Sequence, residues 1–297
     1  MSVSAVARPP ALQRIPSPIL LAIAAAWVAA VTAEATGIAA SFHHDSLLQG
    51  GPAFGLALPL FLLSWQVMTA AMMLPSSLPL VRMFSAASAG APRRGWVLAA
   101  FLGSYALVWS GFGLLAFLGD AGVHAAVNAS PWLTAHDWAI APSVLLAAGA
   151  FQFSSLKDAC LRACRHPASF LRRHYRRGVG GGFALGARHG LFCVGCCWAL
   201  MLVMFAVGAA NLIMMAALTA VMVHEKTRPS GAQTVPLTGV VLLGLGSTLL
   251  LWAAYVNGVI SPGRFRAARY LPARTASTAG RAGLKEGSRP LQISVSA

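Results

Sequence analysis

Long apolar segments, separated by shorter polar ones, follow one another along most of the chain. A helix rises 1.5 Å per residue, so about 20 apolar residues are needed to cross the hydrocarbon core of a bilayer. Segments that approach this length cover residues 19–40, 54–80, 95–118, 139–156, 184–207, 210–224 and 235–257. The pattern predicts an all-α fold, a polytopic transmembrane helix bundle with about seven spans, and counts from six to eight are compatible with it.

The fifth and sixth spans are predicted from a single uncharged stretch. It runs from Gly190 to Val223 and covers 34 residues, which is too long for one straight span. The sequence Gly-Ala-Ala-Asn at 208–211 lies near its middle and is small or polar, so the chain is expected to turn there. The sixth span is therefore predicted to be short.

The two ends of the chain differ from the apolar region between them. Residues 1–18 are expected to form a cytoplasmic N-terminal segment, 19–257 the transmembrane helical domain, and 258–297 a basic, disordered tail. Residues 19–40 are apolar for longer than the core of a signal peptide. This segment is therefore predicted to be the first helix rather than a cleaved leader.

Lysine and arginine are distributed unevenly between the connections. Connections 41–53 and 119–138 hold neither residue, whereas 157–177 holds seven. Since cytoplasmic loops of membrane proteins carry an excess of Lys and Arg, the basic connections are predicted to be cytoplasmic. This indicates a multi-pass protein of a bacterial inner (plasma) membrane with a cytoplasmic N-terminus. Seven spans would put the basic tail on the opposite side, so either the count is six or eight or the tail is translocated.

Composition limits the classes of function. Hydrophobic residues make up 57% and charged residues 10% of the chain, against about a quarter charged residues in soluble domains. The net charge of +15 comes mainly from Lys and Arg between apolar segments and in the tail, which suits anionic lipid better than nucleic acid. The sequence has no phosphate-binding loop, no Ser/His/Asp arrangement and few carboxylates. An enzyme is therefore not favoured.

The five cysteines fall into two tight clusters. Cys160 and Cys164 lie four residues apart at the inner end of the fourth span, and Cys193, Cys196 and Cys197 lie inside the fifth. Because each residue of a helix advances by about 100°, the second cluster occupies one face of its helix.

The same face carries two further soft or borderline donors. His189 lies one turn before Cys193, and Met204 lies two turns after Cys197. Thiolate, imidazole and thioether groups suit copper or zinc. Methionines on one face of the second span extend this set. The candidate metal ligands are Cys193, Cys196, Cys197, His189, Cys160, Cys164, Met68, Met72 and Met204.

The sulfur residues also have a purely structural interpretation. Buried free cysteines often act as small apolar residues, and methionines fill gaps between helices. Two methionine faces matter for metal binding only if they point at the cysteines. These faces hold Met68, Met72 and Ser76 in the second span and Asn211, Met214, Met215, Met222 and Glu225 in the sixth.

A proline interrupts the second span. Pro75 has no N–H, so the carbonyl of Ala71 loses its helical partner. Inside a bilayer such a carbonyl needs another partner, which a neighbouring helix, a nearby serine or a bound ion can supply. A simple kink is the alternative.

Three stretches of the chain carry specific motifs. They read WQVMTAAMMLPSSLP at 65–79, FQFSSLKDACLRACRHP at 151–167 and GARHGLFCVGCCWALM at 186–201, followed by Glu-Lys at 225–226. Together they resemble a bacterial family catalogued as predicted metal-binding integral membrane proteins (domain of unknown function 2182). The resemblance covers over half the chain and leaves the N-terminal segment and the tail outside.

The resemblance implies functional positions in all three stretches. Phe151 and Phe192 stand where the family has tyrosine, and Ala210 stands where methionine often precedes the asparagine. The matching positions are Met68, Met72, Met73, Gln152, Lys157, Cys160, Cys164, His189, Cys193, Cys196, Cys197, Asn211, Glu225 and Lys226.

The leading hypothesis is an integral membrane protein that binds, handles or translocates a transition metal, copper or zinc, through an intramembrane site lined by Cys, His and Met. A membrane thiol redox protein that uses the clustered cysteines, or a structural membrane subunit, are the alternatives. The expected partners are the lipid bilayer and a metal donor or acceptor protein. Nucleic acid is not expected, and the oligomeric state is left open.

Overall fold

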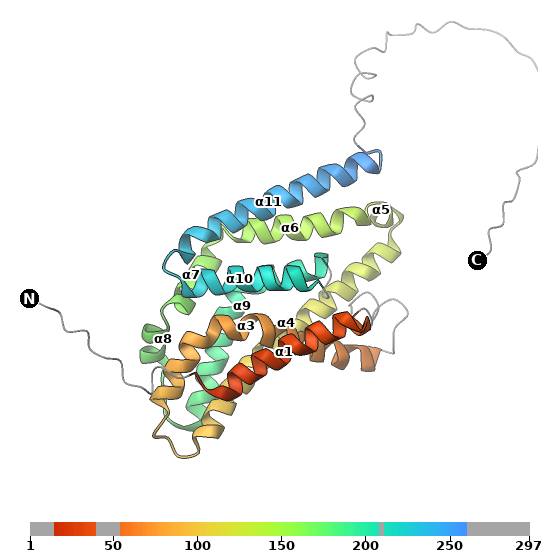
Figure 1. The fold of residues 1–297 in the computed structure, drawn as a ribbon. Coiled ribbons are helices and arrows are strands. Elements are labelled where there is room, and N and C mark those ends of the chain that lie inside the picture. Colours follow the sequence, from red (N-terminus) through yellow and green to blue (C-terminus); the bar gives the residue numbers. More distant parts are fainter. Residues whose placement is uncertain (1–14, 40–53, 208–210, 260–297) are drawn as a thin grey trace, which may run out of the picture.

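The computed structural model of the chain describes residues 15–39, 54–207 and 211–259 (Figure 1). Every regular element in these ranges is a helix, which confirms the predicted all-α fold. The predicted basic tail and most of the N-terminal segment lie outside the described residues.

Most of the longer helices of the described ranges follow the apolar segments of the sequence, whereas α7 and α8 lie in the basic connection after the fourth segment. Two short elements, α5 (Pro131–Thr134) and η3 (Asp137–Ala139), join α4 to α6. The longer helices are α1 (Ser17–Ala35), α3 (Phe54–Ala87), α4 (Arg94–Ala129), α6 (Ile140–Phe151), α7 (Ser155–Arg165), α8 (Pro167–His174), α9 (Gly178–Val207), α10 (Leu212–Thr227) and α11 (Gly231–Val256).

Five of the described helices, α1, α3, α4, α9 and α11, are long and apolar enough to cross a membrane. The segment from Asp137 to Arg165 adds a sixth span if its two parts, which meet at 65°, are counted together. The upper number lies within the predicted range of six to eight and is one below the preferred count of seven, because α10 is shorter than a membrane span. It has 16 residues, about 24 Å, although it lies where the sixth span was expected.

Local sequence explains the length of α10. The Asn211 side chain accepts a hydrogen bond from the Met214 amide (2.9 Å) and caps the first turn. At the other end Arg228 is extended, as the residue before Pro229 tends to be, and the helix stops at Thr227. Helix α9 ends at Val207 and α10 begins at Leu212, and most of the predicted turn, residues 208–210, lies outside the described residues.

The Ala71 carbonyl, which has no helical donor because of Pro75, accepts a hydrogen bond from a neighbouring helix. The indole N–H of Trp27 in α1 donates to the Ala71 carbonyl oxygen at 3.1 Å. Of the partners predicted for this carbonyl, the structure therefore contains a side chain of a neighbouring helix. This bond joins α1 to the middle of α3.

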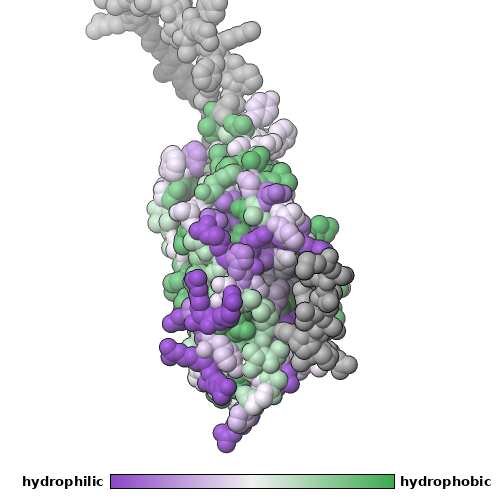
Figure 2. Space-filling model, turned by 90° about the vertical axis from the view of Figure 1, so that its left-hand side faces the viewer, coloured by the Kyte–Doolittle hydropathy of each residue, from purple (hydrophilic) through white to green (hydrophobic). Residues whose placement is uncertain are grey.

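Basic side chains gather at one end of the bundle. The turn between α3 and α4, helices α7 and α8, and the turn between α10 and α11 lie on the left of Figure 1, whereas α1, α4 and α9 end on the right. Figure 2 views the left end and shows hydrophilic residues gathered on it. Four exposed arginines of this end are Arg172, Arg173, Arg176 and Arg177.

Glycines let α9 approach α4 closely. Gly182, Gly186 and Gly190 repeat at four-residue intervals on one face of α9, as small residues do where membrane helices pack. A Cβ at Gly182 would lie 2.5 Å from the Val97 carbonyl oxygen, and one at Gly186 would overlap the carbonyl oxygen of Phe101. Since backbone atoms cannot move aside cheaply, this face requires glycine.

Gly186→Ala is expected to destabilise the bundle by about 1–3 kcal/mol, because the added methyl group overpacks the contact with α4. The thermal unfolding midpoint of the detergent-purified protein measures this effect. Gly180→Ala, in the same helix, is the control, since nothing lies within 4 Å of a Cβ there. Equal shifts in the two variants would show that helix propensity, not packing, is responsible.

Candidate metal centre

After α6 the chain bends by 65°, and α7 packs against α9 in its new direction. The Ser154 side chain accepts a hydrogen bond from the Lys157 amide (3.1 Å), which caps α7 in its new direction. The bend brings Cys160 and Cys164 of α7 alongside the middle of α9. A straight fourth span would have left both cysteines at its end.

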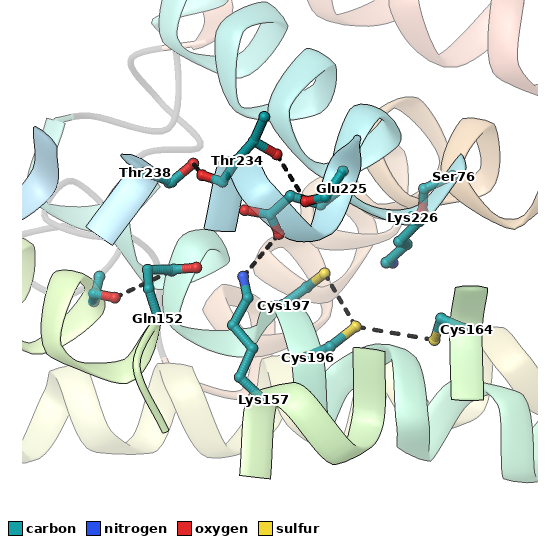
Figure 3. Close-up of polar contacts among 12 residues, drawn as sticks. Ser76, Gln152, Lys157, Cys164, Cys196, Cys197, Glu225, Lys226, Thr234 and Thr238 are labelled. Atoms are coloured by element: carbon teal, nitrogen blue, oxygen red, sulfur yellow. Dashed lines mark hydrogen bonds and ion pairs between the residues drawn. The ribbon is translucent and has the colours of Figure 1, made fainter. Parts of the chain in front are cut away.

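The two cysteine clusters meet where α7 crosses α9. The Cys164 sulfur lies 3.9 Å from the Cys196 sulfur, which lies 3.4 Å from the Cys197 sulfur (Figure 3). Cys196 and Cys197 are each 1% exposed, whereas Cys164 is half-buried. All five cysteines of the chain are free thiols.

Two features of α9 allow this meeting. The helix begins at Gly178, 15 residues before Cys193, so the second cluster lies deep along a long helix. Gly195 leaves room for α7, because a Cβ there would lie 2.5 Å from the sulfur of Cys160. The Cys160 thiol therefore packs against the backbone of α9.

The Cys193 thiol has different neighbours from the other thiols of its cluster. Its sulfur lies 3.1 Å from the Tyr105 hydroxyl of α4 and accepts a hydrogen bond from the Lys226 ammonium at 3.1 Å. Lys226 also donates to the Ser76 hydroxyl at 3.0 Å and is 5% exposed. Within the described ranges no carboxylate lies within ion-pair distance of this ammonium group. Lys226 is thus a buried positive charge directed at a thiol.

The adjacent residue, Glu225, makes a buried ion pair on another side. Its carboxylate accepts from the Lys157 ammonium at 2.8 Å, and these side chains are 1% and 0% exposed respectively (Figure 3). Arg165 donates to the Glu225 carbonyl oxygen and, at 3.0 Å, to the Pro229 carbonyl oxygen. Helix α7 is therefore tied to the C-terminal end of α10 by two basic side chains.

His189 is buried near the thiols, but its ring nitrogen forms a hydrogen bond with a hydroxyl group. Its Nε2 lies 3.0 Å from the Ser77 hydroxyl, and its ring stacks on Tyr105 with centroids 5.5 Å apart. Ser77 in turn donates to the Tyr105 hydroxyl at 3.3 Å. The histidine is therefore connected to Cys193 only indirectly, through the hydroxyl groups of Ser77 and Tyr105.

The predicted methionine ligands are buried, but not all lie beside the thiols. Met68 and Met204 line a common pocket, while Met72 is fully enclosed in the same apolar core as the cysteines. The sequence did not single out Tyr105, and it marked Lys226 only through the family resemblance. A hydroxyl inside an apolar span and a lysine directly after a glutamate were the available signals.

The thiols form two close pairs that share Cys196. In the described part of the chain, no three His, Cys, Asp or Glu side chains are grouped as a ready metal site. Soft thiol and thioether donors are part of the same buried core as the pairs. Such donors select soft metal ions, Cu(I) among them.

Comparison with known proteins identifies a family. The family model PpoB2, described as copper chaperone, matches residues 62–249, which include α4, α6–α10 and most of α3 and α11. No curated protein and no solved structure matches the chain.

Glu225→Gln is expected to lower the free energy of unfolding by about 3–5 kcal/mol, because it leaves the Lys157 charge buried without a partner. Thermal unfolding in detergent measures the loss, and replacing both residues by leucine should recover most of it. Asp158→Asn is the control, since it breaks the exposed pair with Arg162 on the same helix and should cost at most about 1 kcal/mol. A small effect of Glu225→Gln would contradict the structural role given to the pair.

Proposed function

Because this chain belongs to the PpoB2 family of copper chaperones, we propose that it is a membrane protein that carries Cu(I) on the thiols of Cys164, Cys196 and Cys197. The observation that carries this proposal is the 3.9 Å approach of Cys164 on α7 to Cys196 on α9. Cys197, at 3.4 Å from Cys196, supplies a third thiol. Copper is the cargo of such a protein and not a resident cofactor.

The donor chemistry favours copper over zinc. Structural zinc sites are almost always four-coordinate, whereas Cu(I) is held by fewer, softer ligands. Two neighbouring thiol pairs among buried methionines supply such ligands. Binding occurs through thiolates, so Cu(I) binding releases the thiol protons.

Lys226 suits the charge of a loaded site. Three thiolates and one Cu(I) ion leave two net negative charges, which are costly in an apolar core. The Lys226 ammonium, 3.1 Å from the Cys193 sulfur, supplies a positive charge next to the cluster. Lys226 thereby lowers the cost of holding copper as a thiolate complex.

Cys164 is the natural point of transfer. It is half-buried, whereas Cys196 and Cys197 are enclosed, so an acceptor thiol reaches Cu(I) first on the side of Cys164. Helix α7 belongs to the basic end of the bundle (Figure 1). We assign this end to the cytoplasmic side of a bacterial inner membrane, following the distribution of Lys and Arg. The partner is then a metal donor or acceptor protein on that side.

A thiol redox protein is the second candidate. The Cys164 and Cys196 thiols belong to different helices, so a small movement could bring them to bonding distance. Oxidation would then remove two free thiols per chain without any bound metal. Counting free thiols with and without reductant distinguishes this from copper binding.

Cys196→Ser is expected to lower the copper content of the purified protein by roughly 10-fold or more, since it removes the sulfur shared by both pairs. Elemental analysis after growth with copper and purification under reducing conditions measures this content. Cys160→Ser is the matched control, because its thiol packs against Gly195, and it should keep its copper. Wild-type protein without copper, with a thiol count that rises on reduction, would instead support the redox function.

Lys226→Gln is expected to weaken Cu(I) binding by roughly 10- to 100-fold, because the positive charge beside the thiols is lost while hydrogen-bond donors remain. Competition with a coloured Cu(I) chelator measures the affinity. The thermal unfolding midpoint should stay or rise, since a buried charge is removed. Arg228→Gln removes an exposed charge two residues further on and is the control. An equal loss in the control would mean that overall charge, not Lys226, sets the affinity.

A further inference from the structure

Three helices of the core each carry a line of methionines that leads to a polar residue. On α3 the line is Met68, Met72 and Ser76, spaced by four residues. On α10 it is Met215, Met222 and Lys226, and on α9 it is Met204, Met201, Cys197 and Cys193. Spacings of three, four and seven residues keep each line on one face of its helix.

The three lines meet at their polar ends. Lys226 donates to the Ser76 hydroxyl at 3.0 Å and to the Cys193 sulfur at 3.1 Å. One residue from each helix is therefore joined at the edge of the cysteine cluster.

The opposite ends of the three lines also meet. Met68, Met204 and Met215, which we call the methionine triad, line one cavity of about 220 Å³. They are buried, with exposed fractions of 9%, 0% and 3%. Phe61, Trp65 and Phe205 line the same cavity and offer ring faces that attract a cation.

The methionines between the two ends are fully enclosed. Met72, Met201 and Met222 are each 0% exposed. Between the triad and Cys193, α9 runs for 11 residues, or about 16 Å. Each of the three helices thus carries an enclosed methionine between its end at the cavity and its end at the Lys226 contacts.

We propose that the methionine triad is a second copper site, which receives Cu(I) and passes it along Met72, Met201 and Met222 to the thiols. This inference rests on the proposed function. Cu(I) keeps its oxidation state throughout: bonds to neutral thioethers break, bonds to thiolates form, and the thiol protons leave to water. Thioethers carry no charge and bind more weakly than thiolates, so the ion moves toward the cysteines.

The position of the triad agrees with a receiving role. The cavity is bordered by residues near the C-terminal ends of α1 and α9 and the start of α10. These lie at the end of the bundle opposite the exposed arginines of α7 and α8 (Figure 1). A cation that approaches this end is not repelled by those exposed arginines, which belong to the end with the hydrophilic surface of Figure 2.

The test compares two sets of Met→Leu variants in lipid nanodiscs. Met68→Leu, Met204→Leu and Met215→Leu together remove the sulfurs of the triad but keep its apolar volume, so a lipid chain in the cavity would be unaffected. Met83→Leu with Met214→Leu is the control, since neither residue lines the cavity. The transfer of Cu(I) from a coloured chelator complex is followed in time.

We expect the triad variant to load roughly 10-fold more slowly or worse, with the same final copper content, while the control loads like the wild type. An unchanged loading rate would overturn the proposal. A second measurement separates it from the proposed function: Ag(I) binding to a chain with all five cysteines changed to serine. Weak Ag(I) binding that is lost when the triad is also replaced supports the second site, even if the thiols prove not to bind copper. Ag(I) binding that is absent, or that persists without the triad, overturns the second site.

Discussion

The buried ion pair between Lys157 and Glu225 is the interaction on which the arrangement of the site depends. It joins α7 to α10 across 2.8 Å, with both side chains withdrawn from solvent. Each charge costs several kcal/mol to bury, and the cost is offset only while the two face each other. The pair therefore favours the single position of α7 in which Cys164 meets Cys196. Gly195 permits this position, because a side chain there would collide with the Cys160 sulfur.

Two neighbouring charged residues of α10 have different electrostatic roles. Glu225 neutralises Lys157 and so stabilises the fold, whereas Lys226 points to Ser76 and Cys193 without a carboxylate partner in the described residues. A lysine left in this state is costly in an apolar core unless negative charge arrives. In the proposed function, thiolates that hold Cu(I) bring that charge, and the Lys226 ammonium offsets part of it.

The sulfur donors of the core are ordered by type. Neutral thioethers line the cavity and the region behind it, and thiols lie at the crossing of α7 and α9. The half-buried Cys164 adjoins the basic end of the bundle. Copper that followed this order would pass from weak ligands to strong ones and then to a partner protein by thiol exchange.

The sequence by itself determined the helical membrane fold, most helix positions, the uneven distribution of basic residues and the sulfur-rich composition of the core, because hydropathy and helical periodicity are local properties. Its range of six to eight spans includes the upper count of six in the described residues, and its preferred count of seven is one higher because the cap at Asn211 and the stop before Pro229 shorten α10. Only the tertiary structure decided which donors meet: α7 bends away from α6 by 65°, Cys164 faces Cys196, and His189 faces Ser77 instead of the thiols. Lys226 and Ser76 are 150 residues apart. Contacts over such separations follow from how helices pack, which no local pattern of residues encodes.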